Sequence, residues 1–320
     1  MRRQLAIPPL AALLLGWIPS GALAVTLHAG DVVLVDSFID PSPTPAVWRL
    51  DPATLDTTRI SSGGLLVNPD RVAVDAGGHV VVADQVSGLV SIDPVSGAQT
   101  LLLAPSDIGG RTLRGVCRDP AGGLYVTATG GAGPAVLHFD PSTRAWRIVT
   151  SNGNLVEPRG LAAGPGGTLY VADGSVATVG GTGGIIAVDP SGVQTLLTIT
   201  GVALRSPFDI AISPDGYLWT AQWGGLSRRG GGFVRTRISD GYTDYPVGDR
   251  SQGIVITDAG VIYLGDCISI SLDCYNAYRN VAIFPSGPTS YMPSGGMAVV
   301  PSTLTPVRHS TWGSVKTLYR

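Results

Sequence analysis

The sequence predicts an all-β fold, and three observations carry this prediction. Glycine and proline are abundant, with 44 Gly and 24 Pro among 320 residues, while Glu157 and Lys316 are the single glutamate and the single lysine. Helix faces usually need Glu, Lys, Gln and Ala, whereas short strands and turns use Val, Ile, Tyr, Gly, Pro and Asp. Short apolar runs separated by turn residues also recur along the whole chain.

Composition limits the possible partners. With 44% hydrophobic and 14% charged residues, the chain can bury a large core. The formal net charge of −2 gives no electrostatic reason to expect nucleic-acid binding.

Residues 1–24 have the features of a secretory signal peptide. Arg2 and Arg3 precede an apolar stretch at 5–18, and Ala22-Leu23-Ala24 matches the small-x-small cleavage rule. The apolar stretch is too short, and too interrupted by proline, to cross about 30 Å of hydrocarbon. No later segment reaches 18 apolar residues, so the sequence predicts an exported chain without a transmembrane segment, periplasmic or extracellular.

Three cysteines remain after the signal peptide. Cys267 and Cys274 are close enough in sequence to form a disulfide in an oxidising compartment. Cys117, within an apolar strand, is then expected to be a buried thiol.

A repeat of about 45 residues runs through the chain. Each unit begins with an apolar strand after a polar residue, and successive units are 44, 45, 49, 44 and 43 residues apart. These first strands start at Asp70, Arg114, Arg159, Phe208, Gln252 and Gly295. A tight Gly turn leads into second strands at 80–84, 124–127, 169–173, 218–221 and 262–266. Asp-Pro turns at 51–52, 93–94, 140–141 and 189–190 end third strands, and polar fourth strands follow, as at 99–103 and 194–199. Four strands per unit are typical of one β-propeller blade.

The ends of the chain set the number of blades. The N-terminal unit has strands at 32–36, 47–51 and 57–61 but lacks a first strand, which is found instead at 297–300. Pairing the C-terminal strand with the N-terminal blade closes the ring and removes exposed edges. The sequence therefore predicts a six-bladed β-propeller over 25–310, with four antiparallel strands per blade, and a C-terminal tail at 311–320.

The blades carry a resemblance to a known group. Segments 69–84 and 158–173 are similar to repeats that read roughly Pro-x-Gly-Ile-Ala and then Gly-x-Leu-Tyr-Val-Ala-Asp. Such repeats are found in the NHL-repeat, gluconolactonase-like (SMP-30) and streptogramin-lyase-like six-bladed propellers. The resemblance implies the architecture; because such folds host hydrolases, lyases and binding scaffolds alike, function depends on a site.

One face of the disc is the predicted functional face. The long insertions at 37–46, 174–184, 222–232 and 267–280 crowd the face where first strands start, while the short turns lie opposite. The candidate ligand-binding residues on this face are Asp70, Arg114, Arg159, Gln252, Trp223 and Tyr275. Two guanidinium groups can hold a carboxylate or phosphate, and aromatic side chains on loops are typical of contact surfaces. The alternative is that Asp70 only pairs with a neighbouring arginine and that the loops are solvated.

A metal site is the second possibility. In gluconolactonase-like relatives a Glu, an Asn and an Asp near first strands hold a divalent metal, and among the matching positions here only Asp70 is a good metal ligand. Glu157 and Asp209 lie beside such positions on the same face, so Asp70, Glu157 and Asp209 are the candidate metal ligands. The cation would be Ca²⁺, Mg²⁺, Mn²⁺ or Zn²⁺, although Arg114 and Arg159 beside Asp70 would repel it. The lyase alternative needs a histidine base at a first-strand start, and none of the four histidines lies there.

The sequence favours an exported, non-catalytic scaffold that requires no cofactor. It would bind a protein, peptide, glycan or small anionic ligand through the loop-rich face. The alternative is a metal-dependent hydrolase of the lactonase type that uses the three carboxylates.

Overall fold

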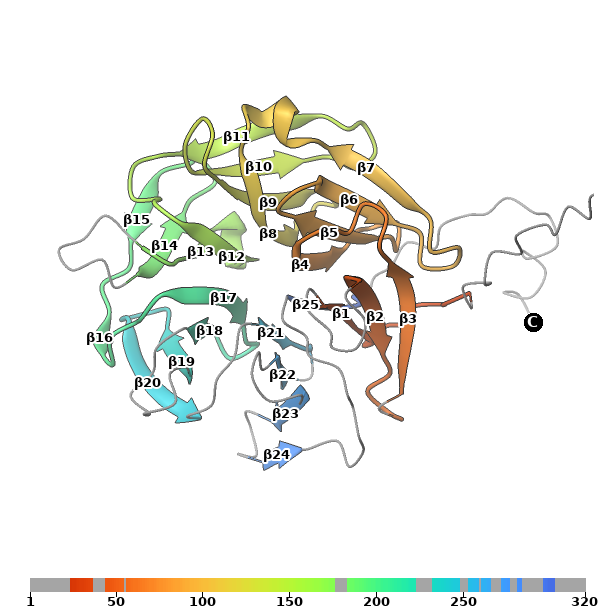
Figure 1. Cartoon of the computed structure of the whole chain (residues 1–320). Coiled ribbons are helices and arrows are strands. Elements are labelled where there is room, and N and C mark those ends of the chain that lie inside the picture. Colours follow the sequence, from red (N-terminus) through yellow and green to blue (C-terminus); the bar gives the residue numbers. More distant parts are fainter. Residues whose placement is uncertain are drawn as a thin grey trace, which may run out of the picture.

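The strands form separate sheets arranged around a common centre (Figure 1). The computed structural model describes residues 24–36, 44–54, 56–175, 183–222, 232–247, 253–258, 260–265, 272–276, 281–283 and 296–302. Residues 1–23 of the predicted signal peptide and the predicted tail lie outside these ranges. No helix in the described ranges has the length and apolar character to cross a membrane.

Within the described residues, neighbouring strands pair in six sheets. The first sheet contains β25 (Met297–Val299), β1 (Val32–Asp36), β2 (Ala46–Leu50) and β3 (Thr57–Ser62). The second contains β4 (Pro69–Val74), β5 (Val80–Asp84), β6 (Gly88–Ile92) and β7 (Gln99–Leu103). The third contains β8 (Thr112–Arg118), β9 (Leu124–Thr129), β10 (Ala135–Phe139) and β11 (Trp146–Ser151).

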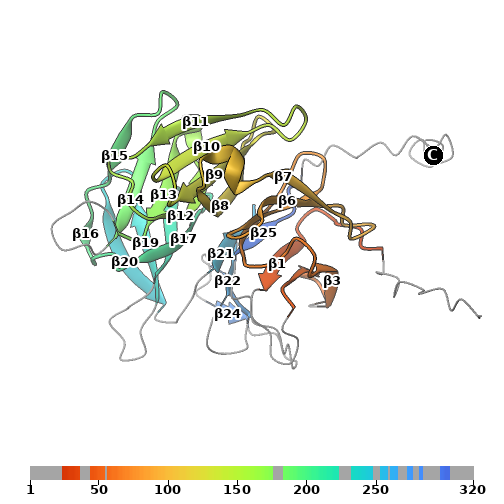
Figure 2. The ribbon, with the colours of Figure 1, turned by 45° about the horizontal axis from the view of Figure 1, so that its top comes forward.

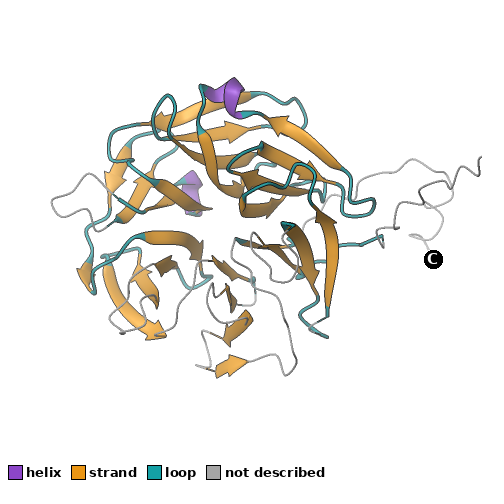
Figure 3. Ribbon diagram, viewed as in Figure 1, coloured by secondary structure: helices purple, strands orange, loops and turns teal. Residues whose placement is uncertain are grey.

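The remaining sheets continue in chain order. The fourth contains β12 (Pro158–Ala163), β13 (Leu169–Asp173), β14 (Gly184–Val188) and β15 (Gln194–Leu196). The fifth contains β17 (Pro207–Ile212), β18 (Tyr217–Gln222), β19 (Gly232–Arg237) and β20 (Tyr242–Val247), with β16 (Thr200–Gly201) parallel to β20. The sixth contains β21 (Gly253–Ile256), β22 (Val261–Gly265), β23 (Leu272–Asn276) and β24 (Val281–Ile283). Apart from two 3₁₀ turns, η1 (Pro105–Ile108) and η2 (Pro165–Gly167), the elements described are strands (Figure 3). The all-β prediction is confirmed.

The innermost strand of each sheet lies near the centre (Figure 1). Each contacts the next in the order β4, β8, β12, β17, β21, β25, and β25 also contacts β4. At the chain ends, β25 pairs antiparallel with β1, with Leu34 opposite Met297. Figure 2 shows β25 beside β1 from a second direction. The molecule is an all-β propeller.

Two parts of the chain differ from the sequence prediction. The fourth strand expected at 194–199 ends at Leu196, and β16 then joins the next sheet beside β20. The insertion expected at 267–280 contains β23, which pairs with β22 along its full length. No Asp-Pro turn marks the end of β23 in the sequence, so the prediction of an uninterrupted loop there was wrong.

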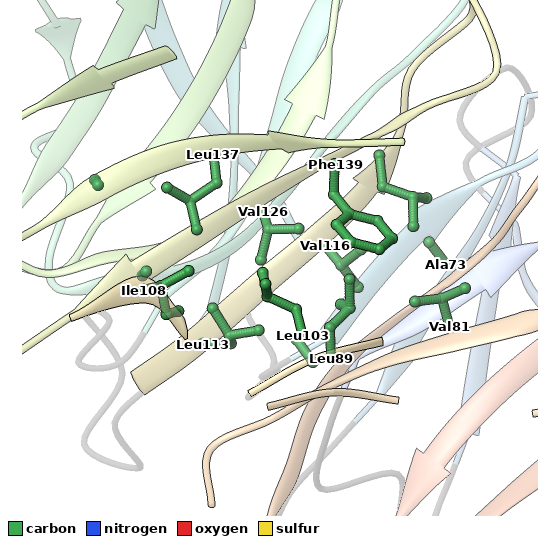
Figure 4. Close-up of a cluster of buried hydrophobic side chains, with 14 residues drawn as sticks. Ala73, Val81, Leu89, Leu103, Ile108, Leu113, Val116, Val126, Leu137 and Phe139 are labelled. Carbon is green, nitrogen blue, oxygen red and sulfur yellow. The ribbon is translucent and has the colours of Figure 1, made fainter. Parts of the chain in front are cut away.

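The hydrophobic core lies between neighbouring sheets. In one cluster, Leu89 and Leu103 of the second sheet pack with Val126 and Phe139 of the third (Figure 4). The side chain of Phe139 is fully buried. Strands β5 and β13 are buried along their whole length, because a middle strand of a blade has another sheet against both faces.

Aspartates at the ends of second strands organise the segments before the first strands. Asp84 accepts hydrogen bonds from the backbone N–H groups of Val67 and Asn68 on one oxygen and of Val86 and Ser87 on the other. Asp173 receives backbone N–H groups in the same way from Val156, Glu157 and Ser175. The repeated aspartate therefore has a structural role at these two positions.

Candidate functional site

The channel mouth is the end of the central channel where the innermost strands begin. Here it denotes Asp70, Arg114, Glu157, Arg159 and Phe208. Bulges interrupt the pairing of β4, β8, β12 and β17 at this level. A bulge re-aims side chains at the rim of a sheet, which is how the starts of these strands present polar groups toward the centre.

A buried ion pair crosses the channel just inside the mouth. Nε of Arg71, on β4, lies 3.3 Å from Oδ2 of Asp209, on β17. Nη2 of Arg71 donates to the backbone oxygen of Phe208 at 2.9 Å, and Nη1 lies 2.7 Å from Oδ1 of Asp70. Because β4 and β17 are three positions apart in the order of innermost strands, Arg71 links opposite sides of the propeller.

Glycines make room for this pair. At the second position of the repeat, four units have Gly115, Gly160, Gly253 and Gly296, while the other two have Arg71 and Asp209. A Cβ on Gly160 would collide with the Asp209 carboxylate, and a Cβ on Gly296 would collide with Cδ of Arg71. The pair therefore fits only because its neighbours have no side chain.

Burial and pairing act against each other on both ionised groups. Burial raises the pKa of Asp209, although the charge of Arg71 and the N–H groups of Ile254 and Ile210 oppose it. Burial alone would lower the pKa of Arg71, but the carboxylates of Asp209 and Asp70 outweigh it and raise that pKa. The pair is held together as an ion pair in a poorly solvated place.

Two more arginines lie at the mouth. Nε of Arg114 is 3.2 Å from Oδ2 of Asp70, an oxygen that also accepts a hydrogen bond from Gln85 at 3.1 Å. Arg159 contacts Glu157, with 2.5 Å between Nη2 and Oε1, and its guanidinium lies 3.8 Å from the centre of the Phe208 ring. The side chains of Arg114 and Arg159 are 18% and 13% exposed, so both remain reachable from solvent.

The two guanidinium groups are short of acceptors. Nε of Arg114 and Nε of Arg159 are buried and have no hydrogen-bond partner among the described residues, since Asp70 is near the first without hydrogen-bond geometry. Burial lowers the pKa of Arg159, and the charge of Arg114 lowers it further against the attraction of Glu157. An additional anion at this position would satisfy donors and relieve repulsion between the two cations.

The three carboxylates predicted as metal ligands are in the same region, but each is already held. Asp70 and Asp209 share Arg71, and Glu157 is paired with Arg159. Within the described ranges, no group of three His, Cys, Asp or Glu is placed to hold a metal ion. Carboxylates that are paired with guanidinium groups are poor ligands for a divalent cation, because their oxygens are occupied and the positive charges repel the cation. A metal-dependent hydrolase stays a prediction from the resemblance, and titration with cations tests it.

Three of the other predicted site residues, Gln252, Trp223 and Cys267, lie outside the described residues. The backbone of Cys274 and Tyr275 belongs to β23 rather than to a loop. The disulfide and the contacts of Tyr275 remain predictions.

The sequence suggests Arg71 or Arg114 as a pairing partner of Asp70, and both contact it in the structure. The contact of Arg71 with Asp209 was missed. The repeat contains a signal for this contact. At the position where four units have glycine, the other two have a positive and a negative residue, Arg71 and Asp209.

No protein-family model matches the chain, and no curated protein matches its sequence. Solved structures do match the fold. A chain of a nidogen/laminin complex gives a TM-score of 0.67 at 13% identity, over 85% of this chain and 98% of that one. A Bacteroides caccae protein of unknown function gives 0.58 at 13% identity, over 85% and 99%. TolB from Acinetobacter baumannii gives 0.64 at 13% identity, over 85% and 67%. At this identity the likeness shows the β-propeller fold alone.

Proposed function

We propose that the protein is an exported, non-catalytic β-propeller whose channel mouth binds an anionic group of a ligand or partner. The observation that carries this proposal is the pair of buried Nε atoms of Arg114 and Arg159, which have no hydrogen-bond partner among the described residues. The bound group is a carboxylate or a phosphate, borne by a small ligand, a peptide, a glycan or a protein. No cofactor is needed for this role.

Physical chemistry favours an anion here. A guanidinium group presents donors in a planar fork that matches carboxylate and phosphate oxygens. Phe208 already fixes the plane of Arg159 by stacking, which lowers the entropy lost on binding. Asp70 and Glu157 each hold one arginine, so that both cations are positioned before a ligand arrives.

We also propose that the propeller has six blades in a closed ring and belongs near the NHL-repeat and SMP-30 group. Support comes from the six sheets, from the pairing of β25 with β1 and from the repeat. The signal peptide that the sequence predicts over residues 1–24 supports export. The nidogen in the nidogen/laminin complex supports the view that this fold can serve as a partner in a protein complex.

Calorimetric titration tests the anion site. Succinate and inorganic phosphate are titrated into residues 25–320 of the wild type, and into the Arg114→Gln, Arg159→Gln and Arg159→Lys variants. Arg147→Gln is the matched control, because Arg147 is exposed on the outer strand β11. We expect binding that falls at least tenfold in both glutamine variants, falls less in Arg159→Lys and is unchanged in the control. Absence of binding, or equal affinity in all variants, contradicts the proposal.

A further inference from the structure

A second candidate site lies deeper in the central channel. The structure has a cavity of about 380 Å³ there, on the other side of the Arg71–Asp209 pair from the mouth. Residues of all six innermost strands line it, and most of these residues are apolar, including Val72, Val116, Leu161, Ile210, Ile254 and Met297. None of the mouth residues Asp70, Arg114, Glu157 or Arg159 lines it.

The cavity extends from the Arg71–Asp209 pair to the opposite face. Arg71 and Asp209 line its inner end. Its lining continues to Arg118, Asp258 and Pro301, where the innermost strands end. This end lies at the hairpin-turn face, which denotes the face of the short turns after β4, β8, β12, β17 and β21.

Arg118 is the cation at the open end. Its Nε atom is buried and has no hydrogen-bond partner among the residues that the structure describes. The nearby carboxylates have other partners: Asp119 contacts His138 at 2.9 Å, and Asp258 accepts from the Ser302 hydroxyl at 3.4 Å. The cavity therefore ends at a guanidinium group whose buried Nε atom has no acceptor among the described residues.

We propose that this channel binds a small monocarboxylate with a hydrocarbon body, its carboxylate on Arg118 and its chain directed toward Arg71 and Asp209. A dry apolar cavity of about 150 Å³ holds a benzene-sized molecule, so this cavity holds an apolar body roughly twice that size. A medium-length alkyl chain fits that space and the apolar walls. The carboxylate supplies the acceptor that Arg118 lacks. The site is separate from the channel mouth and does not depend on it.

Binding of straight-chain carboxylates to residues 25–320, measured by calorimetry, tests the proposal. Acetate, butyrate, hexanoate, octanoate and decanoate are compared, with 1-octanol as the neutral probe. Because each buried methylene contributes about fourfold in affinity, we expect affinity to rise with chain length and then to level off once the cavity is full. We expect 1-octanol to bind at least tenfold more weakly than octanoate. A flat dependence on chain length, or no binding by any of them, overturns the proposal.

Variants separate this site from the mouth. Arg118→Gln is expected to weaken octanoate binding at least tenfold, Arg118→Lys less, and the exposed control Arg147→Gln not at all. Arg114→Gln and Arg159→Gln, which test the mouth, remove carboxylate binding there. We expect them to leave the binding of octanoate that depends on chain length unchanged. If the mouth variants remove octanoate binding and Arg118→Gln does not, the channel site is wrong and the mouth site remains. If succinate binding is absent while octanoate binding needs Arg118, the mouth site is wrong and the channel site holds.

Discussion

At the scale of single residues, the Arg71–Asp209 pair is the feature that most shapes the channel. It separates the mouth from the apolar cavity and joins β4 to β17 across the propeller. A buried pair is weak proof of stability, because desolvation opposes the attraction, but removal of one partner leaves an uncompensated charge. In this channel, the Arg71–Asp209 pair marks the boundary between the polar mouth and the apolar cavity.

Asp209→Ala is expected to lower the free energy of unfolding by about 3 kcal/mol, because the buried charge of Arg71 then keeps Asp70 but loses its carboxylate partner across the channel. The measurement is urea unfolding at pH 7. Asp240→Ala is the control, since Asp240 forms an exposed pair with Arg237, 2.5 Å apart, and should change the unfolding curve little. Equal losses in the two variants would contradict the account.

Cys117 is half-buried on β8, and its surroundings lead to a prediction about thiol reactivity. Burial raises the pKa of Cys117 to about 12, so that at pH 8 almost no thiolate is present. The folded protein should therefore react slowly with a thiol reagent at Cys117, and the unfolded protein at once. If Cys267 and Cys274 form the predicted disulfide, the unfolded, unreduced chain gives one reactive thiol. Three reactive thiols in the unfolded, unreduced chain would disprove the disulfide. Fast labelling of Cys117 in the folded Cys267→Ser/Cys274→Ser variant would disprove the protection of Cys117.

At the scale of elements, the Asp-Pro turns behave as the sequence predicts. In the turn between β10 and β11, Asp140 accepts hydrogen bonds from the backbone and hydroxyl groups of Ser142 and Thr143. These bonds, led by the one from the Ser142 hydroxyl, lower the pKa of Asp140 to about 2. Because the folded pKa lies below the unfolded value, the stabilisation by this group is present above pH 4 or so and is lost as pH falls toward 2.

Asp140→Asn should therefore remove part of the acid sensitivity of the fold. We expect the melting temperature of the wild type to fall more steeply than that of the variant between about pH 4 and pH 2. Thermal unfolding followed by circular dichroism at steps of half a pH unit measures it. Parallel curves would show that the turn does not contribute as described.

The strands could be predicted from the sequence because their pattern is local. Apolar runs, Gly turns and Asp-Pro turns mark β5, β9, β13 and most other strands within a residue or two. The pattern fails at β23, where no Asp-Pro turn follows, and at β16, whose pairing with β20 depends on a neighbouring sheet. The pairing of a strand with a neighbouring sheet depends on residues that are distant in the sequence. It therefore leaves no periodic pattern that a single sequence can show.

At the scale of the whole molecule, two strands far apart in the sequence lie in one sheet. β25 pairs with β1 and forms the innermost strand of the first sheet. The propeller could be predicted because the repeat and its incomplete ends specify this arrangement. The ion pair across the channel could not, because Arg71 and Asp209 are brought together only by the circular order of the sheets. Arg114 and Arg159 were found from their position at strand starts, but their missing acceptors needed the structure.

Two truncations test the role of β25. Deletion of 297–320 removes β25 and leaves the edge of β1 unpaired, so we expect a large loss of stability and a tendency to aggregate. Deletion of 311–320 removes only the predicted tail and should leave the unfolding transition in place. The measurement is thermal unfolding together with light scattering. Equal behaviour of the two deletions would contradict a role of β25 in holding the ends together.

The channel mouth is proposed to bind an anion through Arg114 and Arg159. Thermal unfolding of residues 25–320 compares binding of an anion with binding of a metal ion in one experiment. Transitions are recorded with succinate, with sodium chloride at matched ionic strength, with chelator and with Ca²⁺, Mg²⁺, Mn²⁺ or Zn²⁺. A ligand at a hundredfold excess over its Kd stabilises by about 2.7 kcal/mol. We expect succinate to raise the melting temperature of the wild type by several degrees and to have no effect on Arg114→Gln/Arg159→Gln. A rise with a divalent cation that Asp70→Ala or Glu157→Ala abolishes, without any response to succinate, would contradict the account and favour a metal-dependent hydrolase.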